Sequence, residues 1–72
     1  MSLDGSLSVR VNGEHRRVAG GVSISEMLNG IGIDPAKVAV ERNLQIVPRS
    51  AFGEICVEDG DDFEIVHFVG GG

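Results

Sequence analysis

The dipeptide Asn12-Gly13 constrains the fold of this chain more than any other feature of its sequence. Residues 7–11 before it alternate apolar and polar side chains, which is typical of a half-buried β-strand. Residues 14–19 after it are interpreted as a second strand. Both central positions of a two-residue type I′ turn need a positive φ, which asparagine and glycine tolerate. The sequence therefore predicts that the fold begins with an antiparallel hairpin.

A short amphipathic helix is predicted after the hairpin. Ser23 and Glu26 have the spacing of a capping box, in which each side chain bonds the backbone amide of the other residue. Apolar side chains then recur at helical spacing: Ile24, Met27, Leu28 and Ile31. Gly30, Gly32 and Pro35 end the helix after about two to three turns, so it depends on packing for its stability.

The rest of the chain is predicted to be mostly strand. Alternating or apolar runs indicate strands at 38–42, 45–47, 54–58 and 62–69, with one helical turn at 50–53. If the first and last strands pair in parallel, the segments between them form the crossover. These elements predict an α+β domain of the β-grasp type, a mixed sheet of four to five strands with one helix packed across it. The expected core is Val9, Val11, Val18, Ile24, Leu28, Ile31, Val38, Val40, Ile55, Val57, Phe63 and Ile65.

Length and composition exclude several function classes. A chain of 72 residues forms one small domain, which leaves little room for a deep catalytic pocket. Its net charge of −5 and its lack of Trp and Tyr argue against binding to nucleic acid. No apolar run approaches the ~20 residues that span a bilayer, and no signal peptide is predicted. The single cysteine fits a reducing compartment, so we expect a cytoplasmic location.

The charge is unevenly distributed along the chain. Residues 1–50 carry six cations and five acids, whereas residues 51–72 carry six acids and no Lys or Arg. We expect this acidic third, including Asp59 and Asp61, to steer a basic partner toward the domain. The alternative is a solvated loop that its charges keep soluble.

Three glycines, Gly70-Gly71-Gly72, follow the last predicted strand. Without side chains they favour a flexible, extended tail that could enter a narrow channel in another protein. Such a tail would deliver the α-carboxylate of Gly72, which becomes open to attack by sulfur once it is joined to AMP. The alternative is a disordered tail without a chemical role.

The last strand also offers a docking surface. Val66 and Phe68 share the face of Glu64, so they are expected to be exposed beside the tail. Such exposed apolar residues are typical of a docking patch. The alternative is that both faces of this strand are covered, as in many central strands.

The remaining reactive side chains do not predict a site. His15 and His67 lack further ligands at metal-binding spacing, and His67 is expected at the margin of the core. Cys56 is in phase with two glutamates and should point outward as an ordinary thiol, although a persulfide relay is the alternative. The arginines are interpreted as solvated surface charges: Arg16, Arg17, Arg42 and Arg49.

The sequence resembles the ThiS family, the sulfur carrier proteins of thiamine thiazole synthesis, which are relatives of ubiquitin. The resemblance covers residues 9–72 and includes 11–13, 25–28, 38–43 and 46–49. Its most specific part is Asp59-Gly60-Asp61 followed by Glu64-Ile65-Val66-His67-Phe68-Val69-Gly70-Gly71-Gly72. The family pattern requires two terminal glycines, and this chain has three.

The resemblance implies a carrier rather than an enzyme. A ThiF-type adenylyltransferase would use ATP and Mg²⁺ to form an acyl-adenylate on Gly72. Sulfur from a cysteine desulfurase would convert it to a thiocarboxylate, and a ThiG-type thiazole synthase would take the sulfur. The carrier itself would bind no cofactor and no metal, and it would be a monomer when free. Its partner-binding residues would be Gly70, Gly71, Val66, Phe68, Asp59 and Asp61.

Other functions remain open at this point. The small subunit of molybdopterin synthase has the same fold and tail. A ubiquitin-like modifier conjugated through Gly72, or a β-grasp interaction module without tail chemistry, are further alternatives. The expected organisation is a disordered or non-native start at 1–6, a β-grasp domain at 7–69 and a flexible glycine tail at 70–72.

Overall fold

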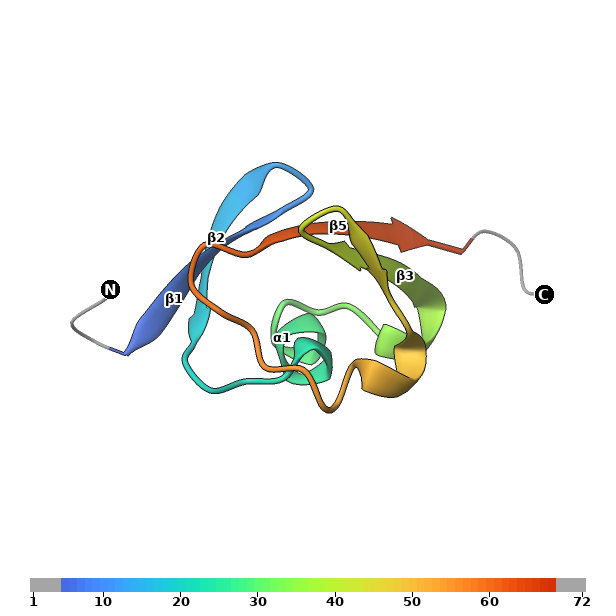
Figure 1. Ribbon diagram of the computed structural model, residues 1–72, viewed down its shortest axis with the longest axis horizontal. Helices are drawn as coiled ribbons and strands as arrows, with labels where there is room; N and C mark the ends of the chain where they lie inside the picture. Colours follow the sequence, from blue (N-terminus) through green and yellow to red (C-terminus); the bar gives the residue numbers. More distant parts are fainter. Residues whose placement is uncertain (1–4, 69–72) are drawn as a thin grey trace.

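The computed structural model describes residues 5–68 (Figure 1). The predicted tail at 70–72 and most of the predicted start at 1–6 lie outside this range. The elements in chain order are β1 (Ser6–Val11), β2 (Glu14–Ala19), α1 (Ile24–Gly30), η1 (Pro35–Lys37), β3 (Val38–Arg42), β4 (Gln45–Val47), η2 (Arg49–Ala51) and β5 (Asp62–His67).

The five strands form one mixed sheet in the order β2-β1-β5-β3-β4. β1 and β5 are parallel, and the other neighbouring pairs are antiparallel. α1 lies across one face of the sheet (Figure 1). The β-grasp prediction is therefore confirmed, including the central parallel pair and the five-stranded sheet.

Both hairpins turn through residues with positive φ. Asn12 and Gly13 have φ values of 51° and 84°, as the type I′ prediction requires. Asn43 and Leu44 have φ values of 51° and 71° in the β3–β4 turn. A leucine in this region costs roughly 1–2 kcal/mol, so surrounding contacts must hold the second turn in place.

Those contacts come from β5, which is held by both turn asparagines. Asn12 Oδ1 accepts from the Ile65 amide at 2.7 Å, and Asn12 Nδ2 donates to the Ile65 carbonyl at 3.1 Å. On the other side of β5, Asn43 Oδ1 accepts from the Asp62 amide at 3.0 Å, and the Asn43 amide donates to the Asp62 carbonyl at 2.8 Å. The Asn12 side chain thus acts as an extra peptide group, whereas Asn43 uses its backbone amide as the donor and its side-chain oxygen as the acceptor. Both residues extend strand pairing past the end of their hairpins.

The capping box of α1 is confirmed. The Glu26 amide donates to Ser23 Oγ at 3.1 Å, and the Ser23 amide donates to Glu26 Oε1 at 2.9 Å. A seven-residue helix is marginal in water, so burial of Ile24, Met27 and Leu28 must supply most of its stability.

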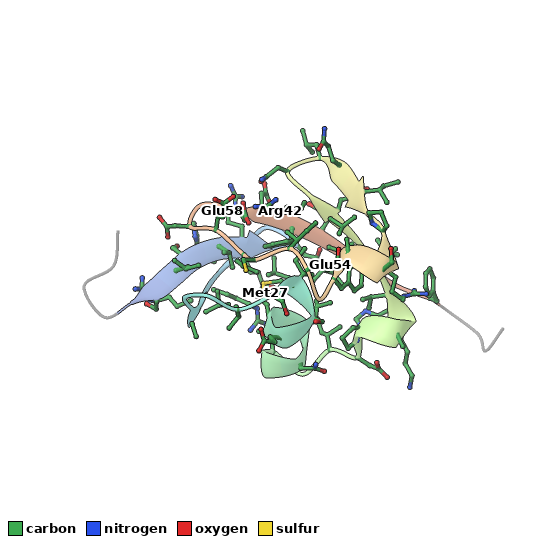
Figure 2. All side chains as sticks on the ribbon, turned by 60° about the horizontal axis from the view of Figure 1, so that its bottom comes forward. Met27, Arg42, Glu54 and Glu58 are labelled. Carbon is green, nitrogen blue, oxygen red and sulfur yellow. The ribbon has the colours of Figure 1, made fainter. Side chains whose placement is uncertain are left out.

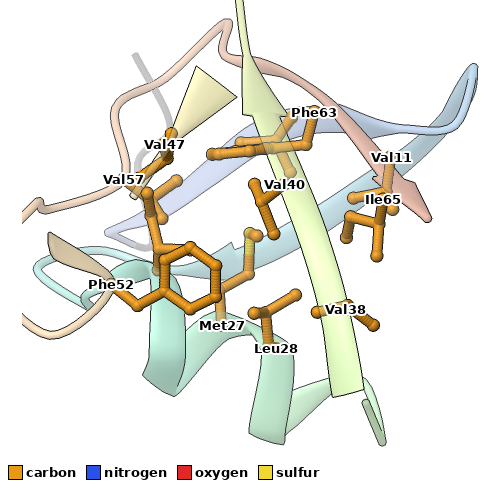
Figure 3. Packing of buried hydrophobic residues seen from close by; sticks show 12 residues of the cluster. Val11, Met27, Leu28, Val38, Val40, Val47, Phe52, Val57, Phe63 and Ile65 are labelled. Carbon is orange, nitrogen blue, oxygen red and sulfur yellow. The ribbon is translucent and has the colours of Figure 1, made fainter. Parts of the chain in front are cut away.

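The core lies between α1 and the sheet (Figure 3). Its buried members are Val9, Val11, Ile24, Met27, Leu28, Val38, Val40, Val47, Phe52, Val57, Phe63 and Ile65. Nine of these twelve were predicted, whereas Val18, Ile31 and Ile55 are only partly buried against them. Phe52 follows a single helical turn, where no periodicity indicates which way a side chain points.

The prediction of a strand at 54–58 was wrong. This segment forms only an isolated bridge between Cys56 and Ser23. Its backbone instead bonds the chain that enters α1, from the Ile24 amide to the Ile55 carbonyl at 3.0 Å and from the Val57 amide to the Val22 carbonyl at 2.9 Å. The predicted alternation of buried and exposed side chains was correct, because Val57 is buried and Cys56 is exposed. However, the backbone of this segment pairs with the residues that lead into α1 and not with a strand.

Substitution of Leu28 tests the position of the core. Leu28 is fully buried, so Leu28→Ala is expected to lower the free energy of unfolding by about 2–5 kcal/mol through lost burial and a residual cavity. Leu44→Ala is the matched control, because Leu44 is 88% exposed. Chemical denaturation of both variants measures the difference. Equal midpoints for the two variants would contradict the assigned helix face.

Candidate functional site

The candidate site is the C-terminal end of β5 with the sheet face opposite α1. The predicted site residues Gly70, Gly71 and Gly72 lie outside the described residues. The structure instead shows the base from which they extend, up to Phe68.

An apolar patch lies on the sheet face opposite α1. Val66 and Phe68 are 61% and 59% exposed, as the alternation predicted, while Phe63 and Ile65 are buried against the helix. Val66 is opposite Ala39 on β3 in the sheet register. Ile46 on β4 is 78% exposed and lies opposite Glu41 of β3. Glu41 is in turn opposite Glu64 of β5, so two glutamates lie between Ile46 and Val66 on this face. We call the exposed apolar residues Ala39, Ile46, Val66 and Phe68 the outer patch.

Sequence analysis missed Ile46 as a member of this patch. Ile46 belongs to a strand of three residues, which is too short for alternation to reveal a face. The only sequence signal for the exposure of Ile46 was the apolar neighbour Val47, which is buried. Successive side chains of a strand point to opposite faces, so burial of Val47 implies exposure of Ile46. His67 was expected at the margin of the core but is exposed, since it is the last residue of β5.

The end of β5 is fixed by contacts with the start of β3. The Phe68 amide donates to the Lys37 carbonyl at 3.0 Å, which continues the β3–β5 pairing. The Arg49 guanidinium lies 5.5 Å from the centroid of the Phe68 ring and donates to the Val38 carbonyl at 3.1 Å. Arg49 therefore positions the strand end and is not only a solvated charge. A cation over an aromatic ring at an exposed site stabilises by about 0.5–1 kcal/mol.

The predicted partner-binding residue Asp61 is not a surface charge. It is only 5% exposed, and its carboxylate lies at the centre of a polar cluster near the start of β5. Its hydrogen-bond donors are Arg42 Nε at 2.8 Å, the Glu58 amide at 2.9 Å and Asn43 Nδ2 at 3.1 Å. Charge reversal at this position would therefore disrupt folding as well as any encounter with a partner.

Arg42 connects this cluster to the surface. Its guanidinium also pairs with the exposed Glu58 carboxylate at 2.8 Å (Figure 2). The expectation that Arg42 is a solvated charge was wrong, because strand pairing brings it next to the loop that precedes β5. Asp59 is exposed, and its Oδ1 accepts from the Ser8 amide at 2.8 Å. Asp59 thus keeps the exposure that steering requires.

The cluster shifts the ionisation of its members. Burial raises the pKa of Asp61, but its three hydrogen-bond donors outweigh burial and hold the pKa of that carboxyl below its usual value. The hydrogen bond to Asp61 is the main cause of the raised pKa of Arg42. Both shifts favour the charged pair.

The other candidate residues form no site within residues 5–68. Cys56 is exposed, as predicted. In this range no group of three or more His, Cys, Asp or Glu side chains could hold a metal ion. None of the helices described has the length and hydrophobicity needed to span a bilayer. The candidate site therefore consists of the strand end and the outer patch.

Comparisons with known proteins agree with this geometry. The model of the ThiS family matches residues 9–72. The crystal structure of the thiamine biosynthesis protein ThiS from Geobacter metallireducens superimposes with a TM-score of 0.75 at 33% identity, over 92% of this chain and 100% of that one. The sulfur carrier protein ThiS of Bacillus subtilis is 40% identical over 50 residues, which are 69% of this chain and 76% of that protein.

A longer protein also contains a similar segment. The thiazole synthase of Paramagnetospirillum magneticum is 48% identical over 62 residues, or 86% of this chain. This chain spans only about a fifth of that relative, 19% of its length.

Removal of the Asp61 charge tests the polar cluster. Asp61→Asn is expected to lower the free energy of unfolding at pH 7 by about 1–3 kcal/mol, because it leaves buried donors poorly satisfied. Glu58→Gln is the matched control and should cost at most about 1 kcal/mol, since Glu58 is in an exposed ion pair. Denaturation at a series of pH values adds a second readout.

The pH dependence has a definite sign. The pKa of Asp61 is lower in the folded state than in the unfolded state, where it is about 4. The contribution of Asp61 to the free energy of unfolding is therefore complete above about pH 4 and is lost as the pH falls through the folded pKa. Asp61→Asn should lack this part of the acid sensitivity. An unchanged pH profile in that variant would show that the carboxylate does not act as described.

Proposed function

The chain belongs to the ThiS family, and on this premise we propose that it is a sulfur carrier in thiamine thiazole synthesis. One observation carries the proposal. A small domain with a central, doubly paired last strand is followed in the sequence by Gly70-Gly71-Gly72. Such a domain can present a narrow peptide segment to another protein without rearranging its own core.

In the proposed cycle the reacting group is the carboxyl group of Gly72. A ThiF-type adenylyltransferase joins this carboxylate to the α-phosphate of ATP, with release of pyrophosphate. A persulfide supplied through a cysteine desulfurase then attacks the acyl carbon with its outer sulfur and displaces AMP, which leaves an acyl disulfide. A thiol breaks the S–S bond of this intermediate, is itself oxidised into a disulfide, and so releases the thiocarboxylate of Gly72. The resulting thiocarboxylate gives its sulfur to a thiazole synthase. The carrier is a co-substrate of these enzymes and not itself a catalyst, and it needs no cofactor of its own.

A ThiG-type thiazole synthase is the partner with most support. A segment 48% identical to this chain occurs within a longer protein named thiazole synthase. A domain and an enzyme joined in one polypeptide act at high effective concentration toward one another, which favours a shared reaction. The reaction is expected to take place in the cytoplasm, where a reducing environment preserves a thiocarboxylate and the single Cys56 thiol.

The outer patch is proposed as the surface that these enzymes recognise. It lies beside the end of β5, so a bound enzyme would contact both the patch and the segment that follows Phe68. Exposed apolar side chains on a sheet face are typical of interaction surfaces. Asp59 adds an exposed negative charge at the opposite end of β5, where it would steer a basic enzyme surface during encounter.

Shortening the chain tests the proposed reacting group. Deletion of Gly72 draws the carboxylate back by about 3.3–3.6 Å, and a misplacement near 1 Å can reduce the rate of a positioned reaction about 100-fold. We expect sulfur transfer to fall by at least this factor while the denaturation midpoint is unchanged. Gly71→Val should have a similar effect, because a branched side chain would obstruct a narrow channel.

Intact mass after incubation with the adenylyltransferase, ATP and a sulfur source provides the readout. Exchange of one oxygen for sulfur marks a carrier, whereas a ladder of conjugates would mark a protein modifier. Normal thiocarboxylate formation and thiazole synthesis by the variant lacking Gly72 would refute the proposal.

Substitution in the outer patch tests recognition. Val66→Ser and Ile46→Ser are each expected to weaken binding to the thiazole synthase or the adenylyltransferase about tenfold or more, as central apolar contacts do. Both side chains are exposed, so stability should change by less than about 0.5 kcal/mol. Leu44→Ser is the control, because Leu44 is exposed on the hairpin turn and not on the sheet face. Calorimetric titration that finds equal affinities for all three variants would remove the patch from the proposal.

A further inference from the structure

The C-terminal end of β5 is held from one side. Within residues 5–68, contacts from the β1 side continue as far as Ile65, which bonds the Asn12 side chain. Beyond Ile65 the strand pairs with β3, and the Phe68 amide donates to the Lys37 carbonyl at 3.0 Å. A strand end with partners on one side opens more readily than a strand held on both. Any further contact to Phe68 therefore helps to define where the terminal segment starts.

Arg49 supplies such a contact from beyond the end of β4. β4 ends at Val47, and the next residue, Pro48, has no N–H group with which to continue the pairing. The Val38 carbonyl of β3 faces this side, because the Lys37 carbonyl faces β5 and successive carbonyls of a strand point in opposite directions. Arg49 takes the place of the missing donor, since its Nη2 donates to the Val38 carbonyl at 3.1 Å.

The same guanidinium lies over the side chain that follows β5. It is 5.5 Å from the centroid of the Phe68 ring. Arg49 thus links the ends of three strands, because it follows β4, bonds β3 and contacts the residue after β5. A cation–π contact is weak at an exposed site and becomes severalfold stronger when water is excluded. Phe68 is 59% exposed and belongs to the outer patch, so an enzyme bound at the patch would remove water from this pair.

We propose that Arg49 is a positioning residue for the reaction at Gly72 and that it acts through Phe68. This role rests on the proposed sulfur-carrier function and adds to it the contact that orients the reacting segment. Four residues follow Phe68, and in an extended chain they would span about 13–14 Å, so Arg49 acts at a distance from the carboxylate. An enzyme that covers the outer patch tightens the pair while the segment enters the channel.

Binding and presentation should then depend on different residues. Val66 and Ile46 determine how tightly an enzyme holds the domain, so their loss raises KM. Arg49 determines how often the bound domain presents Gly72 to the active site, so its loss lowers kcat. This division between kcat and KM distinguishes a positioning residue from one more contact in the docking surface.

The test measures adenylation of the whole chain by a ThiF-type adenylyltransferase, as release of pyrophosphate over a range of carrier concentrations. Arg49→Gln removes the charge but keeps a hydrogen-bond donor. We expect it to lower kcat about fivefold or more, the effect of losing a desolvated cation–π contact, with KM within about twofold. Arg49→Lys keeps a cation and should retain kcat within about twofold.

Arg16→Gln is the matched control for loss of charge. Arg16 is on β2, at the edge of the sheet opposite to β4 and beside a groove of about 220 Å³ between β2 and α1. This variant makes the same substitution far from the end of β5. It should change neither kcat nor KM.

A double variant tests whether Arg49 acts through the ring. Phe68→Leu keeps an apolar side chain on the outer patch but removes the aromatic face. Two residues that act through one contact have non-additive effects, so adding Arg49→Gln to Phe68→Leu should lower kcat by less than about twofold further. Additive losses in the double variant would overturn the proposal.

Solvent exchange of the Phe68 amide gives a readout without any enzyme. In NMR measurements this amide should exchange about two- to fivefold faster in Arg49→Gln than in the unaltered chain, because the contact is weaker at an exposed site. Arg16→Gln should leave the exchange rate unchanged. Equal exchange rates in Arg49→Gln and the unaltered chain would show that Arg49 does not hold the strand end.

The kinetic outcomes separate this role from the proposed function. A raised KM with unchanged kcat in Arg49→Gln would overturn the proposal, because Arg49 would then belong to the docking surface. Unchanged kcat and KM, or equal losses of kcat in Arg49→Lys and Arg49→Gln, would overturn it as well. In each of these cases the unaltered chain is still adenylated. Failure of the unaltered chain to be adenylated would instead refute the proposed function itself.

Discussion

The structure depends on the pairing of β5 between two hairpins. β1 and β3 contribute backbone partners on its two sides, and the turn asparagines of the same hairpins extend that pairing through their side chains. Asn12 and Asn43 therefore combine two tasks that are usually separate. Each adopts the positive φ that its own turn requires. Each also accepts a hydrogen bond from a backbone amide of β5, a strand distant in the sequence. β5 lies between the two hairpins in the sheet, so without it no strand would connect them.

Because β5 is central, one of its faces belongs to the core and the other is open to solvent. The helix covers one face of β5 and buries Phe63 and Ile65, while the opposite face leaves Val66 exposed. The first residues of β5 pair with β1 on one side, and Phe63 to His67 pair with β3 on the other. Beyond Ile65 the strand is held by β3 and by the hydrogen bond from the Phe68 amide to the Lys37 carbonyl, and these contacts give a carrier a defined base for its terminal segment.

The irregular segment between β4 and β5 closes the domain with polar contacts as well as apolar ones. Phe52 and Val57 complete the core beneath it (Figure 3). Asp61 then binds the segment to β3 through Arg42 and to the second hairpin through Asn43. Buried charges are costly unless they are paired and hydrogen-bonded, and here the carboxylate has three donors. The acidity of the C-terminal third is thus partly structural, and only its exposed members, such as Asp59, are available to a partner.

The sequence by itself determined the features that depend on near neighbours. The type I′ turn at Asn12-Gly13, the capping box from Ser23 to Glu26, and the alternation that exposes Val66 follow from backbone and side-chain geometry within a few residues. The glycine segment and its family resemblance likewise required no coordinates. Tertiary structure alone decided the rest: the burial of Asp61, the pairing of Arg42, the placement of Ile46 on the same sheet face as Val66, and the groove beside β2. Each of these joins residues far apart in the chain or on different elements. Local alternation predicted a strand at 54–58 as readily as in β5, because periodicity records which side chains are buried and not which backbone lies alongside.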